Sequence, residues 1–405
     1  MAGPRKTAIH GESMVNPEIW PFVSVLILNF NGKSWLKECL DSIENSDYPK
    51  ERYEVILGDN ASTDDSVVYV REHYPEVRVI AFDDNYGFCR SNNLCAKEAR
   101  GEYLVFLNND TSVTVSWLTE LVRGALSDPV VVSCASKILF PPFRQAFSLS
   151  KNPERQRASL LNSAGGRIFI TGSSIYDGWM QEDGPAYDFP KDTGFGCAAG
   201  VLVEQKFFLE TGGFDEYYFH SVEEMDLGWR AWSRGKKVRY IPSAVMYHWM
   251  GKTGTAGGKM PPEILFLVLR NSLYFIVKNF EFFTALRGLL LFFAKTFFTL
   301  GYTLGTGNGA AFLAVGRAYG CFLKDLGKAF RARTFTQKER TIGDRELLKA
   351  GVLAGGRDVL RMTFSGLRDQ KERFPGGLYD KKDIMKIREN KQGRFVFHRT
   401  SQTGA

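Results

Sequence analysis

The chain of 405 residues is poor in the features that mark secreted or metal-stapled proteins. Its six cysteines are scattered, and no pair has the C-x-x-C spacing of a zinc knuckle or a redox motif. We therefore expect reduced thiols in a cytosol, where disulfides are rare. The first twenty residues contain no apolar run, so no secretory signal is expected.

A clean membrane-spanning segment of roughly twenty apolar residues is also missing. Residues 264–304 are long, apolar and aromatic, but polar or charged side chains interrupt them at Arg270, Asn271, Lys278, Arg287 and Lys295. The uncharged stretch 296–316 is diluted by glycines and polar residues. We expect helices that lie in the membrane interface rather than cross it. Packing on the rest of the protein or in a homo-oligomer is the alternative.

Positive charge is confined to one end of the chain. The chain has 52 Lys and Arg against 45 Asp and Glu, a net charge of +7. Residues 331–405 alone hold 18 basic and 9 acidic residues, so the preceding 330 residues carry a small negative charge. A basic tail suits an anionic surface, either nucleic acid or the inner leaflet of a membrane. A solvated extension fits the same composition. No nucleic-acid motif is present, so we expect no nucleic-acid partner.

Apolar strands alternate with helical patterns along the first 140 residues. Strands are predicted at 22–29, 53–57, 77–82, 103–108 and 130–135, and helices at 34–43, 87–100 and 115–126. This alternation predicts an α/β fold with a mainly parallel central sheet and helices on both faces. Loops and short strands are expected over 141–196, then a strand at 198–203, a helix at 221–234 and a strand at 237–241.

Four segments follow from this pattern. Residues 1–21 form an N-terminal extension and residues 22–260 the α/β domain. Residues 261–330 form apolar, amphipathic helices that associate with a membrane or an oligomer, and residues 331–405 a basic extension.

Ligands of parallel sheets bind beyond the carboxyl ends of the strands, so polar residues at these ends are the first candidates. Asp59 ends the second strand and Asp110 follows the fourth. Turn or capping roles are the alternatives for both. The segment 85–93 follows the third strand and opens a helix, where Gly87 and Arg90 could meet phosphate.

Three carboxylates crowd into four residues at Glu223, Glu224 and Asp226. Mutual repulsion can raise one pKa into the range of a general base. An acidic first helical turn is the alternative, although Leu227 and Trp229 directly follow. His248 stands after a strand-like run and is a candidate metal ligand, with a core or surface role as the alternative.

In order along the chain, these motifs closely resemble glycosyltransferase family 2, in particular its rhamnosyltransferase-like bacterial branch. The matching segments are VSVLILNFNG (23–32), DNASTDDS (59–66), NYGFCRSNN (85–93), GEYLVFLNNDT (101–111), GCAAGVLVEQKFFLETGGFDEYYF (196–219), EEMDLGWRAWSRGKKVRYIPSAVMYHW (223–249) and RN (270–271). The resemblance covers roughly residues 22–275.

The resemblance implies a GT-A fold with a site that binds the nucleotide, holds a metal ion with the diphosphate, and deprotonates the acceptor. Asp59 would contact the nucleobase, and the donor site as a whole would comprise Asn29, Asn31, Asp59, Asn60, Asn85, Gly87, Arg90, Asn93 and Asn109. Asp110 and His248 would hold Mg²⁺ or Mn²⁺ together with the donor diphosphate. Glu224 would be the catalytic base, with Glu223 and Asp226 as alternatives.

Two positions depart from the family pattern. Asn108 stands where a stricter Asp-x-Asp motif has its first acid, and Glu224 replaces an Asp, so its carboxylate reaches one methylene further.

The implied function is inverting transfer of a sugar from a nucleotide diphosphate, with dTDP-rhamnose or a UDP-sugar as the donor. The acceptor would be a hydroxyl of a saccharide or lipid-linked acceptor in cell-surface polysaccharide synthesis. The expected location is cytoplasmic, peripheral at the inner face of the cell membrane. The alternative is an inactive nucleotide-sugar-binding or membrane scaffold protein of the same fold.

Overall fold

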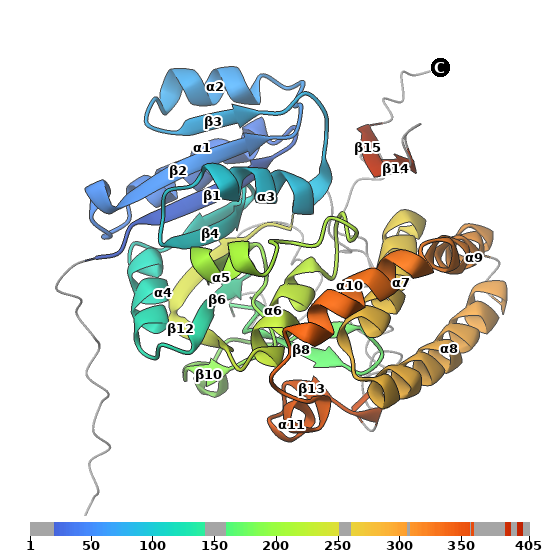
Figure 1. Cartoon of the computed structure of the whole chain (residues 1–405). Helices are drawn as coiled ribbons and strands as arrows, with labels where there is room; N and C mark the ends of the chain where they lie inside the picture. Colours follow the sequence, from blue (N-terminus) through green and yellow to red (C-terminus); the bar gives the residue numbers. More distant parts are fainter. Residues whose placement is uncertain are drawn as a thin grey trace, which may run out of the picture.

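The computed structural model describes residues 20–141, 159–250, 261–305, 308–356 and 358–359, together with strands β14 (Met385–Glu389) and β15 (Phe395–Arg399). A mixed sheet dominates the described chain, with helices packed on its faces and further helices to one side (Figure 1). Its central strands run in the order β10-β12-β6-β11-β4-β1-β2-β3.

The first half of the sheet is parallel, as expected. It comprises β1 (Val23–Asn29), β2 (Tyr53–Asp59), β3 (Arg78–Ala81) and β4 (Tyr103–Asn108). Asn29 of β1 lies in register with Asp59 of β2, and Leu28 with Asn108 of β4. The polar residues that end these strands therefore meet at one edge. Three helices accompany this half: α1 (Lys33–Glu44), α2 (Ser66–His73) and α3 (Gly87–Glu98), whereas α4 (Trp117–Leu126) packs against the second half of the sheet.

The second half brings the later motifs to the same edge. The strand β11 (Gly200–Glu204) runs antiparallel between β4 and β6 (Val131–Leu139), and β12 (Lys237–His248) runs parallel to β6. Both β6 and β12 extend beyond their predicted ends. The register slips between Ile241 and Val245, at Pro242, which has no N–H to donate to a ladder. Beyond this bulge β12 continues to His248, which pairs with Thr111 of the short strand β5 (Thr111–Val113).

Residues 159–196, where loops and short strands were expected, form short strands beside the main sheet. The strand β7 (Leu161–Ser163) pairs with β6, and β10 (Lys191–Asp192) pairs with β12. A separate small sheet contains β8 (Gly166–Phe169), β9 (Ser174–Tyr176) and β13 (Leu353–Ala354). Two further helices are α5 (Gln205–Glu210) and α11 (Asp344–Lys349).

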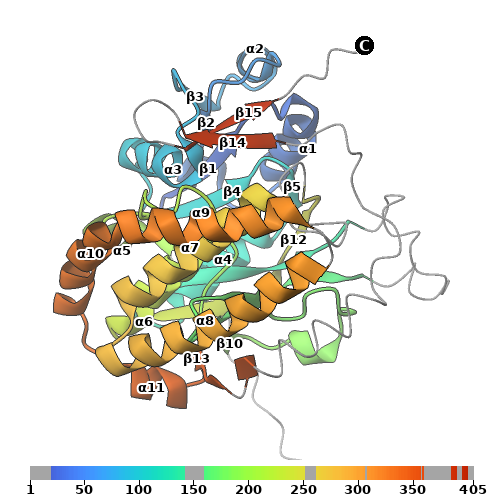
Figure 2. The ribbon, with the colours of Figure 1, turned by 90° about the vertical axis from the view of Figure 1, so that its right-hand side faces the viewer.

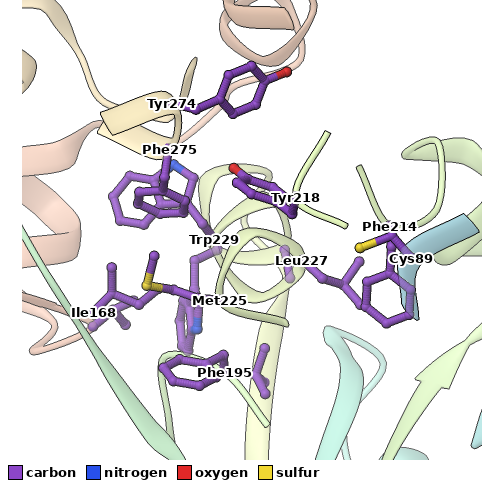
Figure 3. Close-up of a cluster of buried hydrophobic side chains, with 14 of the residues drawn as sticks. Cys89, Ile168, Phe195, Phe214, Tyr218, Met225, Leu227, Trp229, Tyr274 and Phe275 are labelled. Atoms are coloured by element: carbon purple, nitrogen blue, oxygen red, sulfur yellow. The ribbon is translucent and has the colours of Figure 1, made fainter. Parts of the chain in front are cut away.

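The helix α6 (Glu223–Ser233) is buried between the sheet and α7 (Pro262–Asn279). Met225, Leu227 and Trp229 of α6 join Tyr274 and Phe275 of α7 in one cluster of buried side chains (Figure 3). The apolar character of α7 therefore serves the protein core. Residues 262–280 belong to the packing that holds the acidic helix in place.

The remaining C-terminal helices lie on the side of the molecule away from β3: α8 (Phe282–Gly305), α9 (Gly309–Lys324) and α10 (Leu326–Lys338) (Figures 1 and 2). Among the described residues, no helix has both the length and the apolarity to span a bilayer. The expected fold class, a mainly parallel sheet with helices on both faces and C-terminal helices, is confirmed.

Candidate active site

A chain of amide and carboxylate groups lines the ends of β1 and β2. The Asn29 amide donates to Asp59 Oδ1 at 2.8 Å, and the Asn109 amide donates to Asn29 Oδ1 at 2.7 Å. Asp59 also accepts from the Ser62 backbone N–H at 2.9 Å and its hydroxyl at 2.6 Å. The buried Asp59 carboxylate is thus held in one orientation by three donors. The resemblance assigned no role to Ser62.

The backbone conformation of the turn after β1 positions Asn31 for this hydrogen-bond network. Asn31 adopts a left-handed conformation with φ of 51°, and its backbone N–H donates to Ser62 Oγ at 2.9 Å. The side chain of Asn31 accepts from the Thr63 N–H at 2.7 Å. A Cβ at Gly32 would lie only 2.0 Å from Asn109 Nδ2, so a larger residue there would displace the Asn109 amide from Asn29.

The start of α3 faces the same edge. Asn60 accepts a hydrogen bond from the Ser91 hydroxyl, and Asn85 Oδ1 accepts one from the Gly87 N–H at 3.0 Å. Gly87 has φ of +77°, which favours glycine. Arg90 stacks on the ring of Tyr86, 4.0 Å from its centroid, and this contact holds its guanidinium near the helix N-terminus.

Asn93, which was predicted to contact the nucleotide sugar, forms hydrogen bonds within the protein instead. Its amide donates to the Phe214 carbonyl and accepts from the Phe214 N–H, both at 2.8 Å. Asn93 is buried and joins α3 to the segment before α6. This geometry favours a structural role, and Asn93 forms no part of the donor site proposed below.

Asp110 and His248 come together although 138 residues separate them in the chain. Pairing of β5 with β12 brings His248 Nε2 to 3.3 Å from Asp110 Oδ1. Both residues are buried, and the Asn108 amide lies 3.4 Å from His248 Nε2. The Trp249 N–H donates to the Asp110 carbonyl at 3.0 Å, which fixes the chain on both sides of the pair.

This pair fits a divalent cation. Two ligand atoms 3.3 Å apart can both lie about 2.1 Å from one ion at an angle of roughly 100°, between octahedral and tetrahedral geometry. Among the described residues, no group of three or more His, Cys, Asp and Glu side chains could hold a metal. Oxygen atoms of a bound diphosphate or of water would complete the coordination sphere.

Glu224 and Glu223 have different surroundings at the start of α6. Glu224 accepts from the Tyr176 hydroxyl and from the Ala198 N–H, the latter at 2.6 Å. Glu223 is buried, and its Oε2 has no hydrogen-bond partner among the described residues. Burial and the neighbouring Glu224 raise the pKa of Glu223 to about 8.

Glu224 is the better candidate of the two for an ionised carboxylate, because it accepts two hydrogen bonds, whereas Glu223 Oε2 has no partner among the described residues. Burial raises the pKa of Glu224, and the donors on Tyr176 and Ala198 and the nearby His248 offset part of that rise. An ionised carboxylate is required of a base, and Glu224 has the donors that stabilise it. Tyr176 comes from β9, in the region whose pattern predicted no role.

Asp226 is the most deeply buried of the three acids and is fully paired. It accepts from Arg230 at 2.8 Å, Lys278 at 2.9 Å, Asn279 at 2.8 Å and the Tyr218 hydroxyl at 2.9 Å. Burial would raise the pKa of Asp226, but Lys278 and Arg230 outweigh it and hold that pKa at about 2. Asp226 connects α6 to α7 and favours a structural role over that of a base.

Comparison with known proteins assigns a family to part of the chain. Residues 24–176 match the model of Glycosyl transferase family 2. This part of the chain is therefore a glycosyl transferase family 2 domain.

Relatives extend the similarity beyond that domain. The O-antigen biosynthesis protein RfbC of Myxococcus xanthus is 29% identical over 233 residues, which cover 54% of this chain and 16% of RfbC. A probable N-acetylgalactosaminyltransferase 9 of Caenorhabditis elegans is 26% identical over 56% of this chain and 39% of its own length. A poly(ribitol-phosphate) beta-glucosyltransferase of Bacillus spizizenii is 37% identical over 22% and 14%. The matches thus span well under half the length of these relatives.

Two solved structures are similar at low identity. One is GalNAc-T7 with UDP, GalNAc and Mn²⁺, at a TM-score of 0.49 and 17% identity, covering 65% of this chain and 48% of the other. The second is the mannosyltransferase PcManGT from Pyrobaculum calidifontis with GDP-Man and Mn²⁺, at a TM-score of 0.47 and 17% identity, covering 83% and 87%. The assignment of a GT-A fold rests on the strand order and the family 2 match.

Proposed function

We propose that this chain transfers a sugar from a nucleotide diphosphate to an acceptor hydroxyl with inversion, in a metal-dependent reaction. The observation that carries the proposal is that residues 198–199 join the Glu223–Glu224 pair to the Asp110–His248 pair. The Ala198 N–H donates to Glu224 at 2.6 Å, and the Ala199 carbonyl accepts the N–H of Asn108, whose side-chain amide lies 3.4 Å from His248, so a ligand pair and a base candidate share one site.

Asp110 and His248 would hold Mg²⁺ or Mn²⁺, which would neutralise charge on the departing diphosphate. Asn29, Asn31, Asp59, Asn60 and Asn109 form the preorganised rim against which the nucleotide would bind. Asn85, Gly87 and Arg90 would contribute the start of α3 to the diphosphate side.

Glu224 accepts the proton of the acceptor hydroxyl in this proposal. The hydroxyl oxygen forms a bond to the anomeric carbon from the face opposite the diphosphate, and the bond from that carbon to the diphosphate oxygen breaks. The electron pair leaves with the nucleotide diphosphate, and the proton stays on Glu224. One displacement inverts the anomeric configuration, and no covalent enzyme intermediate forms.

The role of Glu224 is tested by Glu224→Gln, with Glu223→Gln as the matched control. Loss of a positioned base costs about 10²–10⁴-fold in rate. We expect that loss in kcat for Glu224→Gln, measured as release of nucleotide diphosphate, while the donor still raises the melting temperature. Glu223→Gln should retain most turnover at pH 7, because its carboxyl is already protonated. A larger loss in Glu223→Gln would make Glu223 the base.

The proposed donor is dTDP-rhamnose or a UDP-sugar, and the proposed acceptor is a saccharide or a lipid-linked saccharide in cell-surface polysaccharide synthesis. Support for the acceptor class comes from the similarity to an O-antigen biosynthesis protein and to a poly(ribitol-phosphate) glucosyltransferase. Thermal shifts with a panel of nucleotide sugars, each with and without Mn²⁺, would identify the donor.

We propose further that α8–α10 dock on an anionic membrane surface, which would place the protein peripherally at the inner face of the cell membrane. One face of α8 is exposed and apolar at seven-residue intervals: Phe283 (82% exposed), Leu290 (63%) and Phe297 (81%). Residues 282–338 hold eight Lys and Arg and a single acid, Asp325. Apolar side chains flanked by positive charge suit a bilayer with anionic headgroups.

Vesicle binding tests this surface. The double variant Leu290→Asp, Phe297→Asp should lose binding to phosphatidylcholine vesicles that contain phosphatidylglycerol. Val68→Asp, on an exposed apolar residue of α2, should bind like the wild type. Wild-type binding should weaken in high salt. The wild type could instead fail to bind these vesicles and form a dimer that the double variant cannot form. That result would assign this face of α8 to a homo-oligomer interface.

The second candidate is a protein of this fold that binds a nucleotide sugar or acts as a membrane scaffold without catalysis. It is favoured only by Asn108, which replaces the first acid of the stricter motif. Donor-dependent stabilisation without either sugar transfer or donor hydrolysis would support this candidate.

A further inference from the structure

The segment directly before the acidic helix is held in an unfavourable backbone conformation. Phe219, Ser221 and Val222 have φ values of 62°, 71° and 81°, all in the left-handed region. A β-branched residue such as Val222 is a genuine outlier there. Such conformations persist only where surrounding contacts enforce them, and they concentrate at functional sites.

The enforcing contacts come from a buried asparagine on α7. The Asn271 amide donates to the carbonyls of Tyr218, His220 and Ser221, at 3.0, 2.9 and 2.8 Å. Asn271 is fully buried, and its own oxygen accepts from Arg270 at 2.7 Å. The Asn271 amide therefore binds three carbonyls of the strained segment, and its bond to Arg270 holds the Asn271 side chain in one rotamer.

The strained segment joins two parts of the proposed site. On one side the Phe219 carbonyl accepts the Phe88 N–H at 3.0 Å, and the Phe219 ring packs against Gly87 at the start of α3. On the other side the Val222 carbonyl accepts the Asp226 N–H at 2.9 Å in the first turn of α6. Displacement of this segment would move Glu223 and Glu224 relative to the diphosphate side.

We propose that Asn271 is a positioning residue, which clamps residues 218–221 and thereby aims the base on α6 at the acceptor hydroxyl. The inference rests on the proposed sugar transfer. It gives a role to Asn271, which is fully buried and acts through the backbone of residues 218–221. Its effect should appear in kcat, because a misplacement of about 1 Å in a catalytic group can cost about 100-fold in rate.

The test is Asn271→Asp, which keeps the shape and the acceptor for Arg270 but replaces the donor with a carboxylate oxygen. The control is Ile276→Ala, a buried truncation on the same helix that contacts none of these carbonyls. We expect Asn271→Asp to lose about 100-fold in kcat, a larger effect than any rise in the donor KM. Amide exchange at Phe88 and Asp226 should become faster. Ile276→Ala should lower stability without either change.

Three results would overturn the proposal. One is a folded Asn271→Asp variant with wild-type kcat. Another is an equal loss of kcat in folded Ile276→Ala, since the effect would then follow from stability alone. If the wild type itself transfers no sugar, the proposed function fails separately, and amide exchange alone decides: unchanged exchange in Asn271→Asp removes the clamp.

Discussion

Replacement of Glu223 by glutamine should stabilise the protein at alkaline pH. Glu223 is buried, and its Oε2 has no hydrogen-bond partner among the described residues. Burial and the charge of Glu224 raise the pKa of Glu223 from 4.5 to about 8. The folded state therefore binds a proton that the unfolded state releases between these two pH values. Stability must fall as the pH rises through this window.

The size of the effect follows from the shift. One pKa unit corresponds to about 1.4 kcal/mol, so the full window from 4.5 to about 8 represents at most roughly 4–5 kcal/mol, shared with the coupled Glu224. Glutamine has the same shape and no charge. Glu223→Gln should match the wild type near pH 5 and exceed it by a few kcal/mol above pH 8.

Urea unfolding at several pH values between 5 and 9 measures this difference directly. The control is Glu72→Gln, which changes an exposed glutamate on α2 and should parallel the wild type. Equal pH dependence of the wild type and Glu223→Gln would mean that Glu223 is already ionised at neutral pH. The choice of Glu224 over Glu223 as the base would then fail.

Three further predictions concern the metal pair, the buried ion network and the start of α3. Asp110→Asn should abolish the extra thermal stabilisation that Mn²⁺ gives to a bound donor; an undiminished Mn²⁺ effect would remove Asp110 from the metal site. Lys278→Met should lower the free energy of unfolding at pH 7 by about 3 kcal/mol, because Asp226 loses a buried partner; a loss below about 0.5 kcal/mol in urea unfolding would contradict this. Gly87→Ala should weaken donor binding, and it should lower the free energy of unfolding by more than Gly212→Ala does. Both glycines have positive φ, but only at Gly87 would the added Cβ meet an aromatic ring, that of Phe219, at 2.4 Å. Equal losses of stability in the two variants would contradict this steric explanation.

The order of strands and helices in the first half of the chain was predictable from the sequence. Period and turn signals are local, and the strands ending at Asn29, Asp59 and Asn108 are mostly apolar and buried. The proximity of Asp110 to His248 was implied by the resemblance, and the β5–β12 pairing places them together.

Other features depend on partners that no local pattern reveals. Asp226 looked equivalent to its neighbours, yet Lys278, 52 residues further on, fixes it as an ionised structural group. The apolar pattern of α7 resembled a membrane-associating helix, whereas its side chains fill the core beside α6. The donor from Tyr176 that distinguishes Glu224 from Glu223 lies in a region without a recognisable period.

The most direct test of the central claim is release of nucleotide diphosphate from a nucleotide sugar, in the presence of a saccharide acceptor, by the wild type and by Glu224→Gln. We expect acceptor-dependent release by the wild type that requires Mg²⁺ or Mn²⁺, a product of inverted anomeric configuration, and at least a 100-fold slower reaction in Glu224→Gln. Release at equal rates in both proteins, or a product that retains the configuration, would contradict the proposed base and the single displacement.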